Sequence, residues 1–343
     1  MNQTHSLPWV EKYRPDNLND IISHKEIITT LTNLITNNKI PHMIFYGPPG
    51  TGKTTTIMAC AKKIYGENYR SMILELNGSD DRGINVVREQ IKNFSATDSK
   101  ISNMLISSDN IKKTNIKLVI LDEADAMTYD AQFALRRVVE IYTDSTRFCL
   151  ICNYLTKIIP ALQSRCQMFR FAPINNNDHL LKINKVIEIE DINIEEKAKD
   201  KIVELSDGDM RKSLNLLQSL YMINNNNLIT LNYVYRSIGY PTEEEKEEII
   251  TSLSDKNLNT SYQLLNRLQI EKNLSNHDIV REISSYYGKT YLQNKKKITN
   301  DEQNRLLDMF DNLATIEINL SNNNNGNIQL LAISSVINNY NRK

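Results

Sequence analysis

The chain has 343 residues with 41 basic and 41 acidic side chains, so its formal net charge is zero and its length suits two or three domains. Balanced charge excludes global basicity as a sign of nucleic-acid binding, so any such surface must be a local patch. Four cysteines do not make a disulfide framework in a chain of this size, the N-terminus lacks the apolar core of a signal peptide, and no apolar stretch reaches the length of a membrane span. We therefore expect a soluble intracellular protein without a membrane partner.

The first 173 residues alternate short apolar runs with helical patterns, which predicts a parallel sheet with crossover helices. The near-continuous apolar character of the runs is typical of strands covered on both faces. The expected strands are Met43–Tyr46, Met72–Leu76, Leu118–Leu121, Phe148–Cys152 and Met168–Phe171. The expected crossover helices are Thr54–Tyr65, Ile84–Phe94 and Asp130–Tyr142. Between them, residues 95–115 show no clear periodicity and are expected to form a surface excursion.

A complete phosphate-binding loop follows the first expected strand. Its G-x-x-x-x-G-K-[ST] pattern is formed by Gly47, Pro48, Pro49, Gly50, Thr51, Gly52, Lys53 and Thr54. The glycines let backbone N–H groups surround phosphate oxygens, and the following helix adds the positive end of its dipole. We expect Lys53 to reach the β- and γ-phosphates of ATP and the Thr54 hydroxyl to bind Mg²⁺.

Polar residues follow the third and fourth expected strands of the core. Asp122 closes the run 118–121, so its carboxylate should emerge at the carboxyl edge of the sheet and hold Mg²⁺ directly or through water. Glu123 comes next and can polarise the attacking water. Asn153 follows the later strand 148–152 at the same edge. Position alone leaves Asn153 as either a turn former or a group that orients this water.

Two local matches point elsewhere and are rejected. Residues 122–125 spell the D-E-A-D of a helicase class, and residues 95–97 spell its S-A-T, but here the S-A-T comes first and the required second ATPase-like domain is missing. Cys149 and Cys152 form a C-x-x-C without a second ligand pair at matching spacing. Cysteine is often fully buried, so we interpret this pair as part of a buried strand.

The composition changes after Pro173. Asparagine runs occupy residues 175–177, 224–227 and 322–325, and no later segment has the pattern of a buried parallel strand. Amphipathic stretches such as Met210–Met222 predict helices instead. We expect a small helical domain followed by a larger one, with the asparagine runs as loop filler.

With these residues placed, the chain resembles the AAA+ ATPases and, within them, the small subunits of replication factor C, the sliding-clamp loader of eukaryotes and archaea. The resemblance is dense over residues 7–240 and only architectural beyond. The matching segments are Leu7–Pro15, Pro41–Tyr46 with the phosphate loop, Glu75–Ile84, Leu121–Asp125, Ser164–Cys166 and Gly208–Asn215. Two departures, Gly78 where alanine is usual and Gln163 where leucine is usual, lie outside the expected chemistry.

The resemblance implies roles for residues around the nucleotide. Val10 and Ile22 would line the adenine pocket, with Arg14 nearby. Asn153 would be the first sensor, which favours the functional interpretation left open above. Arg211 would be the second sensor and reach the γ-phosphate of its own subunit's nucleotide; without the resemblance it could equally be an exposed helix arginine.

Arg165 carries the most specific implication of the resemblance. It would project into the ATP site of the neighbouring subunit as an arginine finger and stabilise charge on the transferring phosphoryl group. The protein would then be part of a ring or arc, with weak ATPase activity when alone. The alternative is a structural arginine paired with an acid.

DNA contact is expected at one local patch. Arg82, Arg88 and Lys92 are spaced near one helical face and could place cations against a phosphate backbone. Binding of this kind is insensitive to sequence and sensitive to salt. The alternative is a solvated helix face.

The resemblance implies a three-part α/β architecture. An AAA+ P-loop ATPase core with a parallel sheet would occupy residues 1–173, a helical lid 174–238 and an all-α oligomerisation collar 239–343. The implied function is that of an ATPase subunit in a hetero-oligomeric, pentameric clamp loader. Such a loader opens a ring-shaped sliding clamp and places it on primer–template DNA, in the nucleus or, for a virus-encoded chain, at the site of viral replication.

Two rival functions remain. A ring-forming AAA+ DNA translocase, such as a branch-migration helicase, would need a C-terminal DNA module, and residues 240–343 show no basic recognition helix. A structural clamp-loader subunit that does not hydrolyse ATP is the other. The intact Lys53, Asp122, Glu123 and Asn153 argue against it.

Overall fold

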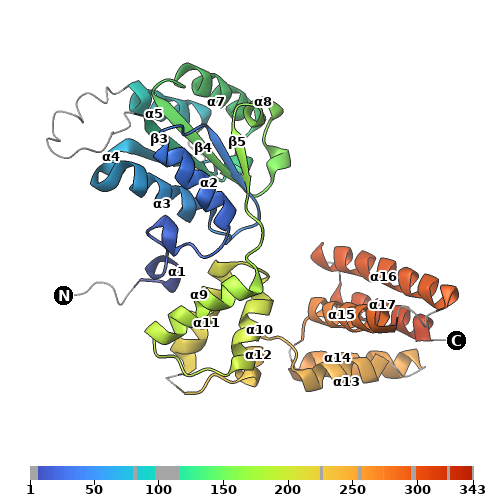
Figure 1. The fold of residues 1–343 in the computed structure, drawn as a ribbon. Coiled ribbons are helices and arrows are strands. Elements are labelled where there is room, and N and C mark those ends of the chain that lie inside the picture. The colour runs from blue at the N-terminus through green and yellow to red at the C-terminus, as the bar shows by residue number, and fades with distance from the viewer. Residues whose placement is uncertain are drawn as a thin grey trace. The chain divides into compact units, whose positions relative to one another are not determined.

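The computed structural model describes residues 7–79, 83–96, 116–224, 227–253, 257–272, 274–294, 299–322 and 325–341. The chain forms two compact units, Met1–Leu228 and Ile229–Lys343. Each unit has its own apolar core and is described separately (Figure 1).

A five-stranded parallel sheet organises the first unit, with strand order β2-β3-β4-β1-β5. The strands are β1 (Met43–Tyr46), β2 (Ile73–Asn77), β3 (Lys117–Asp122), β4 (Thr146–Cys152) and β5 (Gln167–Arg170). All five predicted strands are therefore confirmed, with ends that differ by at most two residues. The order places β1 and β4 at the centre, so the segments that follow them share the carboxyl edge of the sheet.

Helices connect the strands as the sequence predicts. Those of the sheet region are α1 (Trp9–Lys12), α2 (Lys25–Thr36), α3 (Lys53–Tyr65), α4 (Tyr69–Met72), α5 (Gly83–Ala96), α7 (Tyr129–Ile141) and α8 (Pro160–Gln163). Short 3₁₀ turns lie at Leu18–Asp20, Gly66–Asn68, Ala124–Ala126 and Leu155–Lys157. The predicted excursion from residue 95 is corrected at its start, because Ser95 and Ala96 still belong to α5 and Ser95 is buried. Its remainder, residues 97–115, lies outside the described residues.

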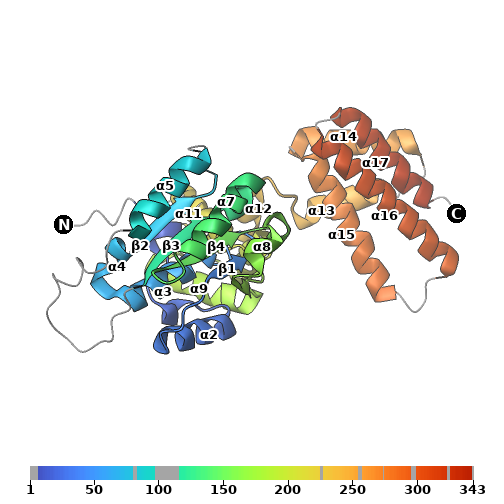
Figure 2. The same ribbon diagram turned by 90° about the horizontal axis from the view of Figure 1, so that it is seen from above.

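Both faces of the sheet are covered by helices, which explains the continuous apolar runs. Successive residues of β3 alternate between faces: Leu118 and Ile120 belong to one core, and Val119 and Leu121 to the other. Figure 2 shows α5 and α7 on one side of the strands and α2 and α3 on the other. Burial on both sides fixes the strands rigidly, so the residues at their ends are held in defined positions.

Three helices complete the first unit after β5: α9 (Asn176–Ile189), α10 (Glu196–Ser206) and α11 (Met210–Asn224). They pack through Ile183, Ile202 and Leu217, all fully buried. The first asparagine run is not loop filler, contrary to the prediction. Asn175 caps α9, its side chain accepting from the Asp178 N–H at 2.7 Å, and the next two asparagines begin the helix.

Helices are the main elements among the described residues of the second unit. They are α12 (Leu231–Ile238), α13 (Glu243–Leu253), α14 (Leu258–Lys272), α15 (Asn276–Asn294), α16 (Asn300–Ser321) and α17 (Gly326–Asn341). Leu265, Ile283, Leu313 and Ile333 are among its buried core residues. The helical character predicted for this half of the chain is confirmed.

Candidate nucleotide-binding site

The phosphate-binding loop joins the end of β1 at Tyr46 to the start of α3 at Lys53. The loop is held in shape from within, because the Thr51 hydroxyl donates to the Pro48 carbonyl at 3.0 Å. It therefore places backbone N–H groups and the N-terminus of a 13-residue helix at the carboxyl edge of the sheet. This arrangement favours bound phosphate.

Lys53 is buried, at 7% exposure, and points back into the loop. Its ammonium donates to the carbonyls of Gly47 at 2.7 Å and Pro48 at 2.8 Å, and to Asn153 Oδ1 at 3.0 Å. Burial lowers the pKa of Lys53, the nearby Asp122 opposes this shift, and Arg211 adds to it. The loop lysine and the asparagine after β4, 100 residues apart in sequence, therefore lie in direct contact.

Thr54 and Asp122 form the second pair at this edge. The Thr54 hydroxyl donates to Asp122 Oδ2 at 2.7 Å. A hydroxyl and a carboxylate side by side supply the oxygen ligands that Mg²⁺ prefers, so the residues fit the predicted metal. Glu123 is exposed beside them, in a left-handed conformation at φ 52°, and its N–H donates to Asp122 Oδ1 at 2.9 Å.

Gly78 packs against this acidic turn. Its N–H donates to the Asp122 carbonyl at 2.7 Å. A Cβ at this position would lie 2.5 Å from the Glu123 carbonyl oxygen, closer than real side chains approach. The glycine that departs from the family pattern therefore directly contacts the backbone that carries Glu123.

Asp125 supports the asparagine after β4, a role that sequence reasoning missed. Its Oδ2 accepts the backbone N–H groups of Asn153 and Tyr154, both at 3.1 Å. The last acid of the rejected D-E-A-D match, Asp125, thus fixes the turn that carries Asn153. The sequence offered one signal, because Asp125 lies only three residues after Asp122.

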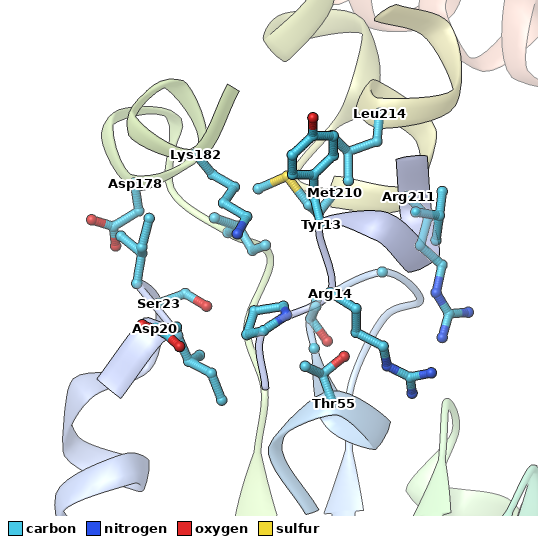
Figure 3. A pocket seen from close by; sticks show the side chains of 18 of the residues that line it. Tyr13, Arg14, Asp20, Ser23, Thr55, Asp178, Lys182, Met210, Arg211 and Leu214 are labelled. Atoms are coloured by element: carbon cyan, nitrogen blue, oxygen red, sulfur yellow. The ribbon is translucent and has the colours of Figure 1, made fainter. Parts of the chain in front are cut away.

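An open pocket lies above the loop (Figure 3). Its lining includes most of the residues predicted for the nucleotide: Val10, Arg14, Ile22, Gly50, Thr51, Gly52 and Arg211. The side chains of Arg14 and Arg211 lie on the same side of it, and those of Asp178 and Lys182 on the opposite side.

Residues to which the sequence analysis assigned no role complete the pocket. They come from the N-terminal segment and from α9 and α11, and include Tyr13, Asp20, Asp178, Lys182, Met210 and Leu214. Burial lowers the pKa of Lys182, and the like charge of Lys185 adds to this shift. Single helix positions of this kind leave no local pattern, so only the fold identifies them.

The helices after β5 dock on the loop itself. The Met210 N–H donates to the Gly50 carbonyl at 3.3 Å, and the Asp209 carboxylate fills the space beside Gly50. A Cβ at Gly50 would lie 1.6 Å from Asp209 Oδ1. Asp209 also accepts the backbone N–H of Arg211 at 2.8 Å, so it caps α11 at the point where Arg211 enters the pocket.

The N-terminal segment is attached to the same helices. Trp9 is buried with its ring 5.5 Å from that of Tyr221, and its backbone N–H donates to Gln218 Oε1 at 3.0 Å. Lys12 forms an ion pair with Glu190 at 2.6 Å, and the Tyr13 hydroxyl also donates to Glu190. The first wall of the pocket is thereby fixed to α9 and α11.

Arg165 lies away from this pocket, at the opposite edge of the sheet. It precedes β5, whose first residue Gln167 pairs with Met43 at the start of β1, whereas the phosphate loop follows Tyr46 at the end of β1. Its Nη1 donates to the Ala161 carbonyl at 2.7 Å, and its Nη2 lies 2.5 Å from Glu140 Oε1. The predicted structural alternative, a partner acid, is thus present, but the side chain remains partly exposed.

The structure describes only part of the predicted DNA patch. Lys92 is exposed on α5. Arg82 lies outside the described residues, and Arg88 belongs to α5 with its side chain outside them. Cys149 and Cys152 are both buried in β4, as the buried-strand interpretation predicted.

Comparisons with known proteins agree with this geometry. Family models match residues 43–174 (ATPase family associated with various cellular activities, AAA), 182–222 (RCF1/5-like, AAA+ ATPase lid domain) and 241–336 (replication factor C C-terminal domain). Replication factor C subunit 3 of Blastobotrys adeninivorans is 41% identical over 336 residues, which cover 98% of this chain and 94% of that protein. The chain belongs to the replication factor C family.

Other replication factor C subunits match a shorter region more strongly. The probable subunit 5 of Dictyostelium discoideum is 56% identical over 220 residues, or 64% of this chain and 61% of that protein. The subunit 5 of Homo sapiens is 54% identical over 218 residues, or 63% of this chain and 61% of that protein. The matched region therefore spans about three fifths of the length of these relatives.

A solved structure shares the fold at low identity. A mutant of RuvB from Thermotoga maritima aligns with a TM-score of 0.52 and 15% identity over 74% of this chain and 85% of that chain. The likeness shows a common AAA+ fold. Within the described ranges, none of the helices combines the length and the apolar character that crossing a membrane requires.

Proposed function

We propose that the chain is one subunit of an ATP-dependent clamp loader that opens a ring-shaped sliding clamp and places it on primer–template DNA. One observation carries the proposal: a complete phosphate site lies at one edge of the sheet, and Arg165 is presented at the other. The chain would thus supply one half of two different ATP sites. Membership in the replication factor C family supports this reading.

The chain's own site would bind and position ATP. Lys53 would exchange its hydrogen bonds to the loop carbonyls for bonds to the β- and γ-phosphates. Burial disfavours the charged form of Lys53, so the negative charge of the phosphates would favour this exchange. Thr54 and Asp122 would hold Mg²⁺, which, when bound, neutralises charge shared by these phosphates. Glu123 would polarise the attacking water, and Asn153 would orient it beside Lys53.

The pocket walls would bind the rest of the nucleotide. Val10 and Ile22 would contact the adenine, with Arg14 beside them. Arg211 would reach the γ-phosphate as α11 closes on the loop through Met210 and Gly50. Nucleotide occupancy would then be transmitted to the three helices α9, α10 and α11.

Arg165 would act on the neighbouring subunit. The strand β5, from Gln167 to Arg170, is about 10 Å long, and Arg165 lies two residues before its first residue. An arginine side chain there does not span the sheet to the loop on its own subunit. Delivered across a subunit junction, its guanidinium would stabilise charge in the neighbour's transition state.

The partners follow from this arrangement. They are the other subunits of a hetero-oligomeric pentamer, the clamp, and primer–template DNA contacted by the patch predicted at Arg82, Arg88 and Lys92. The site of action is the nucleus, or the site of viral replication for a virus-encoded chain. The helical region matched at 241–336 favours a loader over a branch-migration translocase, and the complete set of catalytic residues favours a hydrolysing subunit over a structural one.

The test reconstitutes the complex with its partner subunits and measures ATP hydrolysis site by site. Lys53→Ala should abolish ATP hydrolysis in the chain's own site and should also abolish clamp loading by the complex. Arg165→Ala should reduce turnover about a thousandfold in the adjacent site while nucleotide binding in its own pocket is retained. If Arg165→Ala impaired only its own site, or if both variants loaded clamps normally, the proposal would be wrong.

A further inference from the structure

Arg165 is held by contacts at both of its terminal nitrogens. Nη1 donates to the carbonyl of Ala161 in α8 at 2.7 Å and to the hydroxyl of Ser164, the C-cap of that helix, at 3.4 Å. Nη2 pairs with Glu140 Oε1 at 2.5 Å. A long, partly exposed arginine normally samples many rotamers, so these contacts select one direction for the guanidinium.

Glu140 comes from a different element, the last turn of α7. A carboxylate there meets the negative end of the helix dipole, so it does not stabilise α7 by its position. Its Oε1 also accepts from Arg136 Nε at 3.1 Å, one turn earlier. Arg136, and to a smaller extent Arg165, lower the pKa of the Glu140 carboxyl, so it remains charged at neutral pH.

The three side chains form a +1 cluster in which one carboxylate links two arginines. Arg136 lies on the same helix as Glu140, whereas Arg165 belongs to a separate segment that meets α7 through this ion pair and through the packing of α8. Removing Glu140 would leave two like charges without the anion between them. Arg165 would then keep its Nη1 contacts to Ala161 and Ser164 but lose the contact at Nη2 that completes the selection of its direction.

We propose that Glu140 is a positioning residue for Arg165, which holds the guanidinium in the direction required to reach the neighbouring subunit's ATP. This inference rests on the trans role of Arg165 proposed above. Glu140 itself touches neither nucleotide nor reacting atoms. Its effect should therefore appear only where Arg165 acts.

The experiment uses the reconstituted complex and measures kcat and KM for ATP at the adjacent site. Glu140→Ala places a good helix former at an exposed helix position, so α7 should stay folded. We expect kcat to fall about fivefold, the scale of one partly exposed ion pair, with KM unchanged. Glu140→Gln, which keeps an acceptor for Nη2, should lose less.

Two control variants separate positioning from a general loss of surface charge. Arg136→Gln removes the other arm of the cluster but leaves Glu140 to Arg165, so adjacent-site kcat should remain within about twofold. Glu271→Gln breaks a similar i, i+4 pair with Arg267 on α14 and should leave kcat unchanged. Equal losses in Glu140→Ala and Glu271→Gln would overturn the inference.

The double variant Glu140→Ala with Arg165→Ala provides the decisive comparison. A residue that acts only through Arg165 adds nothing once Arg165 is gone, so the double variant should match Arg165→Ala. Independent, multiplicative losses would reject the positioning role. If Arg165→Ala left the adjacent-site kcat unchanged, the trans role of Arg165 would be wrong. If Arg165→Ala lowered this kcat but Glu140→Ala did not, only the positioning role of Glu140 would be wrong.

Discussion

Glu123 adopts a left-handed backbone conformation, which non-glycine residues enter only at a cost. The conformation is maintained by its neighbours, since its N–H bonds to Asp122 Oδ1 and the Ala126 N–H bonds to its carbonyl at 2.9 Å. Gly78 leaves the space that this carbonyl occupies. The direction of the Glu123 side chain therefore depends on Gly78, which follows β2 and has no Cβ.

Substitution of Gly78 tests this dependence. In Gly78→Ala the new Cβ would lie 2.5 Å from the Glu123 carbonyl oxygen and 3.0 Å from Met127 Cγ, so the acidic turn must shift. We expect kcat for ATP to fall about tenfold with little change in ADP affinity, because a displaced catalytic group costs rate rather than ground-state binding. Gly288→Ala in α15, where nothing lies within 4 Å of the new Cβ, is the matched control. Unchanged kcat in Gly78→Ala would refute the dependence.

His42 predicts a loss of stability in mild acid. It is buried, its Nδ1 accepts from the Phe148 N–H at 3.2 Å, and burial lowers its pKa from 6.5 to about 4, with Arg147 adding to the shift. As pH falls below 6.5 the unfolded chain binds a proton that the folded chain does not, so stability is present at pH 7 and lost toward pH 4.

The expected loss from this residue is about 2 kcal/mol between pH 7 and pH 5. Denaturant unfolding of the wild type and of His42→Asn at both pH values measures it. Asparagine keeps an acceptor for the Phe148 N–H but does not titrate, so the variant should lose correspondingly less stability on acidification. Equal pH dependence of the two proteins would exclude His42 as the cause.

At the scale of elements, the sequence predicted the strands well because both faces of the sheet are covered. Burial on two sides demands continuous apolar runs, and each run ends where the polar residues of the site begin, as Asp122 and Asn153 do. The strand order could not be predicted, since it depends on packing between distant segments. The pocket wall from α9 and α11 was missed for the same reason, with Lys182 as an example. The division at residues 173 and 238 into core, lid and collar stays a proposal.

The start of α11 couples the helices after β5 to the phosphate loop. Asp209→Ala removes the cap of the Arg211 and Lys212 N–H groups, which costs about 1 kcal/mol in helix stability, and vacates the space beside Gly50. We expect ADP to bind several-fold more weakly, measured by fluorescent-nucleotide titration, since Met210 and Arg211 line the pocket. Asp209→Asn keeps the acceptor and should restore most of the affinity. Wild-type affinity in Asp209→Ala would show that this contact does not support binding.

At the scale of the molecule, the chain contains two compact units with separate apolar cores. The nucleotide pocket is lined entirely by residues of the first unit. A bound ligand stabilises the unit that binds it and leaves an independent unit unchanged. The two units should therefore respond differently to nucleotide.

Calorimetry of the whole chain can detect this difference. We expect two unfolding transitions, of which only one moves to higher temperature with ADP. At a hundredfold excess of ADP over its Kd, the free energy of unfolding of that unit should rise by about 2.7 kcal/mol. Lys53→Ala should suppress the shift without moving the second transition. A single transition that shifts as a whole would show that the two units unfold together.

Trp9 is the only tryptophan of the chain, and it is buried at the junction of the N-terminal segment with α11. Its indole lies beside Tyr221 and its backbone is bonded to Gln218. The polypeptide thus carries a built-in optical reporter: its emission spectrum registers whether this segment remains seated, with no dye attached and no competing indole elsewhere in the chain.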